Sequence, residues 1–324
     1  MKLIKNRDFI LFSIVLSGII GVGIANPNFV TFKSLSDVLT DTSLLIILAL
    51  SQMIVILIRA IDLSVASNLA LSGMLISLLS TVYPELPLIF FILLSCAIGT
   101  LLGIFNGVTI AILKVPFIVT TLGTLSIFRG LIYFVSDGKQ VYGSEFSDSF
   151  LSFIHIRFLS LSLLFWIAVV VFIFIYILLN HTKFGRNLYT LGGNPDAAKY
   201  IGINENKYII AAYAISGFFA GLCGYLWIAR YSVASTQVAI GFELTVISAC
   251  VVGGISVMGG IGTVIGCVLG ALLIGLIRNA LPVLDISQFW QLAISGAIIL
   301  IAIIINTKTE QRKEKSIMIE EQNE

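Results

Sequence analysis

The chain alternates between long apolar runs and short polar breaks, and this alternation predicts its secondary structure. About 20 apolar residues in a helix cross the hydrocarbon core of a bilayer, and most of these runs approach that length. We expect ten membrane-spanning helices, over residues 9–25, 43–58, 63–83, 86–113, 116–135, 161–179, 208–231, 242–258, 260–281 and 288–305. Helices satisfy their own backbone hydrogen bonds, as lipid requires. The pattern therefore predicts an all-α polytopic membrane protein.

The first apolar run resembles a secretory signal peptide, because Lys2, Lys5 and Arg7 precede it. A signal peptide ends in small residues at a cleavage site, and the sequence Gly23-Ile24-Ala25 is a poor match to such a site. The run is also long for a signal peptide. We therefore interpret residues 9–25 as the first membrane span.

Composition supports a membrane protein. Hydrophobic residues make up 58% of the 324 residues, charged residues make up 11%, and the mean hydropathy is +1.06. A soluble domain carries about 25% charged residues. We expect residues 1–306 to form a single transmembrane domain, whereas the charged segment 307–324 lacks aromatic residues and is expected to be a disordered tail.

The charges and cysteines exclude several classes of function. A net charge of +2 gives no indication of nucleic-acid binding. Cysteines stand singly in apolar segments, without metal or redox spacing, so we expect them to be small core residues; they are Cys96, Cys223, Cys250 and Cys267.

Lysine and arginine predict the orientation, since loops rich in these residues stay in the cytoplasm. If the chain starts inside, thirteen of its nineteen basic residues lie on the cytoplasmic side. Only Lys33, Lys139 and Arg157 then lie in outer loops, while the remaining three fall near the outer ends of spans. We therefore expect both termini in the cytoplasm, with residues 180–207 as the longest inner loop.

That inner loop contains the signals of a short helix. Asn194 suits the N-cap, Pro195 the first helical position and Asp196 the first turn, and Gly202 suits the stop. Between these marks lie Ala197, Ala198 and Lys199, and Gly192 precedes them. One capped turn is not stable alone in water, so it lies against the membrane face of the protein or against a partner. An ordinary helical loop is the alternative.

Two sequence echoes suggest an internal repeat. Asp62-Leu-Ser-Val-Ala-Ser67 begins the third expected span, and Glu243-Leu-Thr-Val-Ile-Ser248 begins the eighth. The fourth and ninth spans share an Ile-Gly-x-x-Leu-Gly pattern at Ile98 and Ile265. The repeat unit is then five spans, so the halves, about 9–135 and 161–306, are inverted in the membrane. Inverted halves are typical of transporters, although chance recurrence of common membrane residues remains an alternative.

Several residues are candidates for a translocation path or gate. Gly253, Gly254, Gly259 and Gly260 flank the short eighth span, which would suit a gate if it is broken. Glycines spaced by four in the fourth and ninth spans are expected to be helix-packing faces, or surfaces on which helices slide.

The charged candidates have more than one interpretation. Asp62 and Glu243 are expected to cap helix N-termini, with a role in the path as a secondary interpretation. Arg278 lies deep in a span, where it snorkels or pairs with Asp285 or Glu243.

Missing motifs limit the mechanism. The sequence has no G-x4-G-K-[ST] motif for nucleotide binding and no acidic residue in the middle of an expected span for a proton or sodium relay. No residue cluster indicates an intramembrane enzyme or a metal site. A carrier of this kind takes its energy from elsewhere, and the inner-loop helix is placed to receive force from a motor subunit.

The chain resembles the membrane permeases of sugar-type ABC importers. The matching motifs are Ile61-Asp-Leu-Ser-Val65, Asn106-Gly107, Lys114-Val-Pro116 continuing to Thr124, Gly185-Arg186, Gly192-x-Asn194-x3-Ala198-x3-Gly202-Ile203, and Val252-Gly-Gly-Ile-Ser256 with Gly259-Gly260-x-Gly262. They occur in order along nearly the whole chain. Ala60 and Ala66 stand where the family usually has glycine. The matched polar residues Asn106, Thr121 and Thr124 join the candidates for the path.

The resemblance implies a function and a set of partners. Residues 194–202 would be the coupling helix, seated in a cytoplasmic ATPase with two nucleotide-binding halves, so that ATP is bound by that partner and this chain has no cofactor. A second permease copy or a paralogue would complete the channel in the bacterial inner membrane, and a binding protein would deliver a monosaccharide. The furanosyl signal autoinducer-2 remains an alternative solute, and an ion-coupled secondary carrier is an alternative of a different class.

Overall fold

The computed structural model describes residues 2–152 and 156–284, together with isolated positions between 286 and 304. Within these residues, eight helices are long and apolar enough to cross a membrane. They are α1 (Lys2–Ala25), α2 (Phe32–Leu57), α3 (Val65–Val82), α4 (Leu88–Ala111), α5 (Phe117–Ser136), α7 (Leu163–His181), α10 (Glu205–Tyr231) and α12 (Val264–Val283). The chain is thus an all-α polytopic membrane protein, as the sequence predicted.

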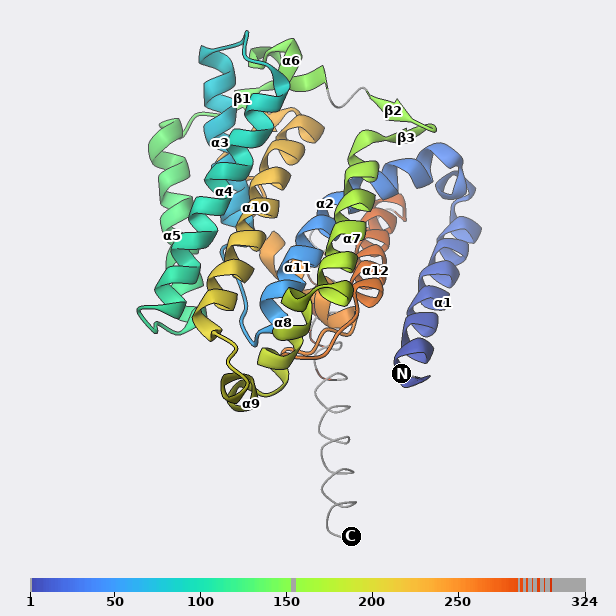
Figure 1. Ribbon diagram of the computed structural model, residues 1–324. Helices are drawn as coiled ribbons and strands as arrows, with labels where there is room; N and C mark the ends of the chain where they lie inside the picture. The colour runs from blue at the N-terminus through green and yellow to red at the C-terminus, as the bar shows by residue number, and fades with distance from the viewer. Residues whose placement is uncertain are drawn as a thin grey trace.

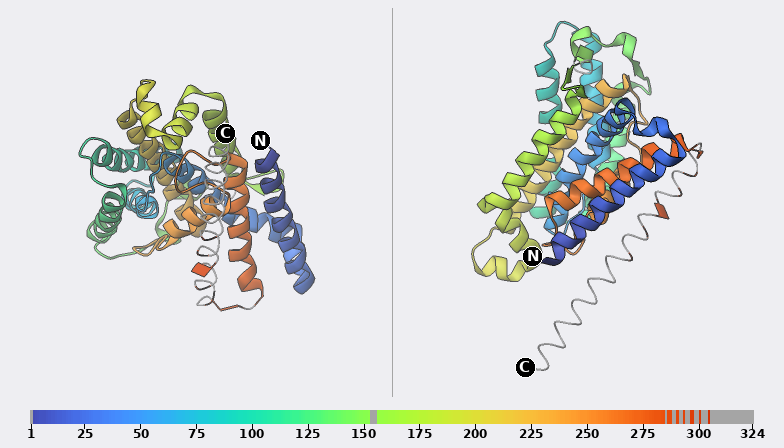
Figure 2. Two further views of the ribbon diagram at one scale, coloured as in Figure 1. Left: turned by 90° about the horizontal axis from the view of Figure 1, so that it is seen from below. Right: turned by 90° about the vertical axis from the view of Figure 1, so that its right-hand side faces the viewer.

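Helix α2 forms the centre of the bundle. Its residues from Thr42 to Leu57 are all buried, because the helix is apolar around its whole circumference in this part. It packs against α7, α10, α12 and the short helix α11 (Phe242–Val252). Helix α1 lies at the edge of the bundle beside α12, as two views agree (Figure 2).

Glycine allows α4 and α10 to pack with their backbones in close approach. A Cβ atom at Gly99 or Gly103 would overlap backbone oxygens of α10, and one at Gly221 would overlap the backbone oxygen of Ser95 on α4. Helices α11 and α12 approach in the same way: a Cβ atom at Gly270 of α12 would overlap the Ala249 carbonyl oxygen, and one at Gly253, just after α11, would overlap the Gly266 carbonyl oxygen. The small-residue faces are therefore packing surfaces, as expected for membrane helices.

The two ends of the bundle differ (Figure 1). One end carries the start of α1, helix α8 (Lys183–Gly193) and helix α9 (Pro195–Tyr200). The opposite end, called the outer end below after the orientation that the sequence predicts, carries the 3-10 turns η1 (Pro27–Val30) and η2 (Gly143–Glu145) and the short helix α6 (Asp148–Leu151). It also carries two small antiparallel ladders, in which β1 (Val141–Tyr142) pairs with β4 (Val233–Ala234), and β2 (Arg157–Phe158) pairs with β3 (Leu161–Ser162).

The expected count of ten spans is not confirmed. The eighth span, expected over 242–258, is the helix α11 of 11 residues, which rises only about 16 Å. It ends where Gly253 and Gly254 follow, and Gly254 has a φ of +90°, a left-handed conformation that stops a helix. The tenth span, expected over 288–305, and the tail 307–324 lie outside the described residues, apart from isolated positions.

Candidate functional site

Helix α9 forms as its sequence predicts. The Asn194 side chain accepts a hydrogen bond from the Ala197 N–H at 2.9 Å, and Pro195 occupies the first turn with Asp196. At the other end, Gly202 adopts a φ of +81° and the Ile203 N–H donates to the Ala198 carbonyl at 3.0 Å. The turn is therefore capped at both ends, which satisfies backbone groups that a six-residue helix otherwise leaves free.

One side of α9 is buried and the other is open. Ala198 is fully buried against the core of the chain itself. Tyr200 and Ile201 are 92% and 70% exposed, although both are large and hydrophobic. Adjacent exposed apolar side chains of this size on a rigid turn are typical of a surface that a partner covers. We call residues 195–201 the knob below.

The knob is attached at its base to two distant segments. Arg59, which follows α2 with a φ of +64°, donates from Nε to the Gly192 carbonyl at 2.6 Å and from Nη2 to the Gly193 carbonyl at 2.8 Å. The Gly260 N–H donates to the Leu57 carbonyl at 2.9 Å. A Cβ atom at Gly192 would overlap the Leu57 carbonyl oxygen. The ends of α2 and α8 thus contact the loop between α11 and α12. We call this contact region the inner joint.

Tyr189 adds a further link to the inner joint. Its hydroxyl donates to the Gly262 carbonyl at 3.0 Å. Burial, and to a smaller extent the neighbouring Cys267 thiol, raises the pKa of Tyr189 to about 12. The hydroxyl therefore stays protonated, and able to donate, at every physiological pH. Two of the glycines predicted for a gate, Gly259 and Gly260, also lie at the inner joint. They pack against Gly192, one of the residues predicted for coupling.

Asp62 lies inside the bundle, just before α3, with 1% of its surface exposed. Its Oδ1 accepts from the Ser64 N–H at 2.9 Å and from the Ser64 hydroxyl at 2.6 Å, and its Oδ2 accepts from the Ser216 hydroxyl at 3.3 Å. No lysine or arginine of the described residues forms an ion pair with it. Its carboxylate binds the N-cap residue Ser64 and so holds the segment that leads into α3, but Asp62 is not itself the cap that the sequence predicted.

The other polar candidates of the first half gather around Asp62. Asn106 of α4 donates to the Ser64 hydroxyl at 2.8 Å. The Thr121 hydroxyl lies 2.8 Å from the Phe117 carbonyl of its own helix and 3.4 Å from the carbonyl of Ile61, the residue before Asp62. Thr124 lies one turn further along α5. All three side chains are buried. Asp62, Ser64, Asn106, Thr121 and Ser216 form what we call the buried polar cluster, which ties α3, α4, α5 and α10 together.

The two α10 residues that reach this region were not identified from the sequence. Ser216 reaches Asp62, and the Tyr213 hydroxyl donates to the Ile61 carbonyl at 3.1 Å. They are three residues apart, so they share one face of a helix. That spacing beside Gly217 and Gly221 was the available signal, but it does not identify the partner helix.

The charged candidates of the second half lie near the outer end. Glu243 occupies the first turn of α11, and its Oε2 is buried without a hydrogen-bond partner among the described residues. Arg278 does not pair with Glu243 there; its guanidinium carbon lies 5.1 Å from the centre of the Phe242 ring. Asp285, the other expected partner, lies outside the described residues. Glu243 and Arg278 are therefore separate from the inner joint and from the buried polar cluster.

Among the residues that the structure describes, no three or more His, Cys, Asp or Glu side chains lie together in a way that could hold a metal ion. All four cysteines are free and buried. The exposed knob and the inner joint form a continuous connection between α9, α2 and the loop that follows α11.

Comparison with known proteins agrees with this description. The family model described as branched-chain amino acid transport system / permease component matches residues 34–303. The chain is 38% identical to a ribose import permease protein of Haemophilus influenzae, over 96% of this chain and 95% of that protein. It is 35% identical to a galactose/methyl galactoside import permease protein of Escherichia coli, over 89% and 90%.

A relative with a different printed solute is also similar. The chain is 31% identical to an autoinducer 2 import system permease protein of Photorhabdus laumondii, over 98% of this chain and 94% of that protein. No solved structure matches the chain.

Proposed function

We propose the function from one premise: the chain belongs to the permease family of branched-chain amino acid transport systems, within which it is a permease of the sugar-import type. We infer that it conducts a monosaccharide across the bacterial inner membrane as the transport subunit of an ATP-driven importer. The observation that carries this proposal is the knob, a doubly capped turn that exposes Tyr200 and Ile201 and is hydrogen-bonded at its base to the inner joint.

The proposed partners follow from two observations: the sequence has no G-x4-G-K-[ST] motif for nucleotide binding, and the chain is similar to import permeases for sugars. A separate cytoplasmic ATPase with two nucleotide-binding halves receives the knob, so ATP is bound there and not by this chain. A second permease copy or a paralogue completes the channel, and a binding protein delivers the solute from outside. Both termini are then cytoplasmic, in agreement with the positive-inside rule. The start of α1 lies at the same end of the bundle as the knob.

The proposed mechanism depends on the inner joint. When the ATPase closes on ATP, the knob moves with it. The pull is transmitted through Gly192 to Arg59 at the end of α2, and to Gly260 in the loop after α11. Helix α11 is short and leads from this loop towards the outer end, so a movement of the loop can tilt it as a unit. Movement at the knob then opens the path on one side of the membrane and closes it on the other.

The pairing of helices supports the proposal of two inverted halves. Helices α2, α3 and α4 are the second, third and fourth expected spans, and their counterparts five spans later are α10, α11 and α12. Exchange of each span with its counterpart turns the α4–α10 contact into the α12–α2 contact. The same exchange turns the α3–α10 contact into the α11–α2 contact, and both members of each pair are present. Acidic residues lie near the beginnings of α3 and α11, which run in opposite directions (Figure 1): Asp62 is buried and Glu243 is half-buried.

Transport by the reconstituted importer tests the function. The permease, its ATPase and its binding protein are placed in liposomes, and uptake of labelled ribose, galactose and autoinducer-2 is measured with and without ATP. We expect ATP-dependent uptake of a monosaccharide. Uptake that persists without ATP and collapses with an ion gradient would instead identify a secondary carrier, and uptake of autoinducer-2 alone would assign the signal as the solute.

A further inference from the structure

A cavity of about 180 Å³ lies at the outer end of the bundle, between α2, α10, α11 and α12. It is smaller than the roughly 300–1,000 Å³ that drug-sized ligands occupy, so it suits a small solute. It is separate from the buried polar cluster and from the inner joint, which share none of its lining residues. The residues that matter for its chemistry are Asp41, Thr42, Trp227, Tyr231, Phe242 and Arg278.

Aromatic rings form one side of the cavity. Trp227 and Tyr231 are one turn apart on α10, with ring centres 5.2 Å apart. The Phe242 ring meets Trp227 edge to face at 5.1 Å. Rings of this kind offer flat apolar faces, together with the polar N–H and O–H groups of Trp and Tyr at their edges. Such a wall accepts a molecule that has both C–H faces and hydroxyl groups.

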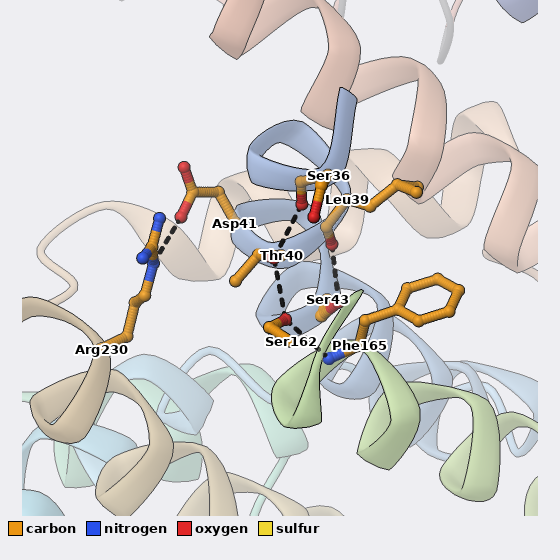
Figure 3. A network of polar contacts seen from close by, with 8 residues as sticks. All are labelled: Ser36, Leu39, Thr40, Asp41, Ser43, Ser162, Phe165 and Arg230. Carbon is orange, nitrogen blue, oxygen red and sulfur yellow. Dashed lines mark hydrogen bonds and ion pairs between the residues drawn. The ribbon is translucent and has the colours of Figure 1, made fainter. Parts of the chain in front are cut away.

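Charged groups at the cavity are already held in place. The Arg230 Nε donates to the Asp41 Oδ1 at 2.9 Å, which fixes the carboxylate at the outer part of α2 (Figure 3). The hydroxyl of the neighbouring Thr40 lies 2.8 Å from that of Ser162, the N-cap residue of α7. A carboxylate has lone pairs for several donors, so Asp41 keeps acceptor capacity beyond this pair. Arg278 lies over the Phe242 ring and has N–H groups for acceptors. The cavity therefore offers both donors and acceptors without a large excess of either charge.

Thr42 is the observation that points to a ligand. It lines the cavity, is 2% exposed, and its hydroxyl has no hydrogen-bond partner among the described residues. A buried hydroxyl without a partner is unfavourable, because it has lost its hydrogen bonds to water and gained none in the protein. Gly275 of α12 packs directly against the Thr42 side chain, because a Cβ atom there would overlap it, so the hydroxyl is enclosed as it stands. Rotation about the Thr42 Cα–Cβ bond would turn the hydroxyl towards the cavity, where a ligand hydroxyl would satisfy it.

We propose that this cavity is a binding subsite for an uncharged polyhydroxylated ring, the chemical class to which monosaccharides belong. The ring lies against the Trp227 and Tyr231 faces, and its hydroxyls donate to Asp41 and accept from Arg278. Another ligand hydroxyl pairs with Thr42. The subsite receives solute on the outer side of the membrane, and this role rests on the proposed import function.

The subsite is connected to the inner joint by α11. Phe242, the first residue of α11, lines the cavity, and the loop that follows α11 reaches Leu57 through Gly260. A tilt of α11 would therefore move the Phe242 ring, and with it the support for Arg278. The structure thus connects occupancy of the cavity with the segment that the knob moves.

Fluorescence of Trp227 tests the subsite on the full-length permease in lipid nanodiscs. Trp166→Phe and Trp290→Phe leave Trp227 as the single tryptophan. D-ribose and D-galactose are titrated as probes, and cyclohexanol serves as a ring with one hydroxyl. We expect a saturable change with a sugar and none with cyclohexanol. If Trp227 fluorescence changed with neither sugar, or changed equally with cyclohexanol, the proposal would be overturned.

Thr42→Val, compared with Thr120→Val, tests the contact that singles out this cavity. Thr120 is also a buried threonine without a hydrogen-bond partner among the described residues, but it lies on α5 and does not line the cavity. We expect Thr42→Val to raise the sugar Kd by about fivefold, as the loss of one neutral hydrogen bond does, and Thr120→Val to leave it unchanged. Equal effects of the two variants would contradict the assignment.

Uptake by the complete importer separates this proposal from the proposed function. ATP-driven sugar uptake with a silent Trp227 reporter would refute the subsite and leave the import function standing. A reporter that saturates, in an importer without ATP-driven uptake, would refute the import function and leave the subsite standing.

Discussion

Arg59 holds Gly192: its Nε donates to the Gly192 carbonyl at 2.6 Å, across 133 positions of sequence. The bond joins the end of the central helix α2 to the end of α8, from which the knob projects. A second bond from the same guanidinium, to the Gly193 carbonyl at 2.8 Å, fixes the direction of the contact. The knob is thus attached to the core of the bundle by a planar group with little freedom to rotate.

Arg59→Lys should weaken coupling while preserving the charge. Lysine has a single ammonium group, so it cannot reproduce the two fixed bonds to Gly192 and Gly193. We expect the ratio of sugar transported to ATP hydrolysed to fall severalfold in the reconstituted importer. Arg186→Lys is the matched control, because Arg186 is an exposed residue of α8 that makes no side-chain bond to the inner joint. An unchanged ratio in Arg59→Lys would show that the joint does not transmit force.

Gly192→Ala and Gly193→Ala form a second pair. A Cβ atom at Gly192 would overlap the Leu57 carbonyl oxygen, whereas one at Gly193 would meet nothing within 4 Å. Because backbone cannot give way as a flexible side chain does, we expect Gly192→Ala to displace α8 and lower the thermal unfolding temperature by several degrees. Gly193→Ala should leave that temperature unchanged. Similar unfolding temperatures for both variants would contradict the close approach of α8 to α2.

Asp62→Asn should destabilise the bundle by about 1–3 kcal/mol, the cost of disturbing a buried group with several hydrogen bonds. Asn keeps one acceptor oxygen and replaces the other with an amide donor, so either Ser64 or Ser216 loses its acceptor. Ser216→Ala removes only the bond at 3.3 Å, and we expect a smaller loss. Unfolding in nanodiscs measures both. A loss in Ser216→Ala as large as in Asp62→Asn would place the main support elsewhere.

Tyr189 gives the inner joint a pH dependence at alkaline pH only. Its pKa is raised to about 12, above the ordinary value of about 10, so the folded state retains a proton that the unfolded state loses between these values. The contribution is complete below pH 10 and decreases as the pH rises towards 12. We expect the stability difference between the natural protein and Tyr189→Phe to shrink over this range. A difference that grows with pH would contradict the assignment of the hydroxyl as donor to Gly262.

Local features of the knob could be predicted from sequence, because they depend on neighbouring residues. Asn194, Pro195 and Gly202 carry out the capping that their types favour. The exposure of Tyr200 and Ile201 could not be predicted, since it depends on how α9 lies against the rest of the bundle.

Contacts between residues far apart in the chain could not be predicted from the sequence for a similar reason. The Asp62–Ser216 bond crosses 154 positions, and both residue types are common helix caps and helix-face residues. Apolar composition predicted a span over 242–258, but the run Gly253-Gly254 ends α11 early and turns the remainder into the loop of the inner joint. The glycine pairs of this segment suggest from sequence alone that the eighth span could be broken. In the structure the helix ends at Gly253-Gly254.

A photo-crosslinking amino acid at position 200 tests the central claim most directly. The same group at Tyr142, an exposed residue of the outer end, is the control. We predict that position 200 crosslinks to an ATP-hydrolysing subunit in the assembled importer and that position 142 does not. An intact importer in which position 200 forms no such crosslink, or in which position 142 does, would contradict the account.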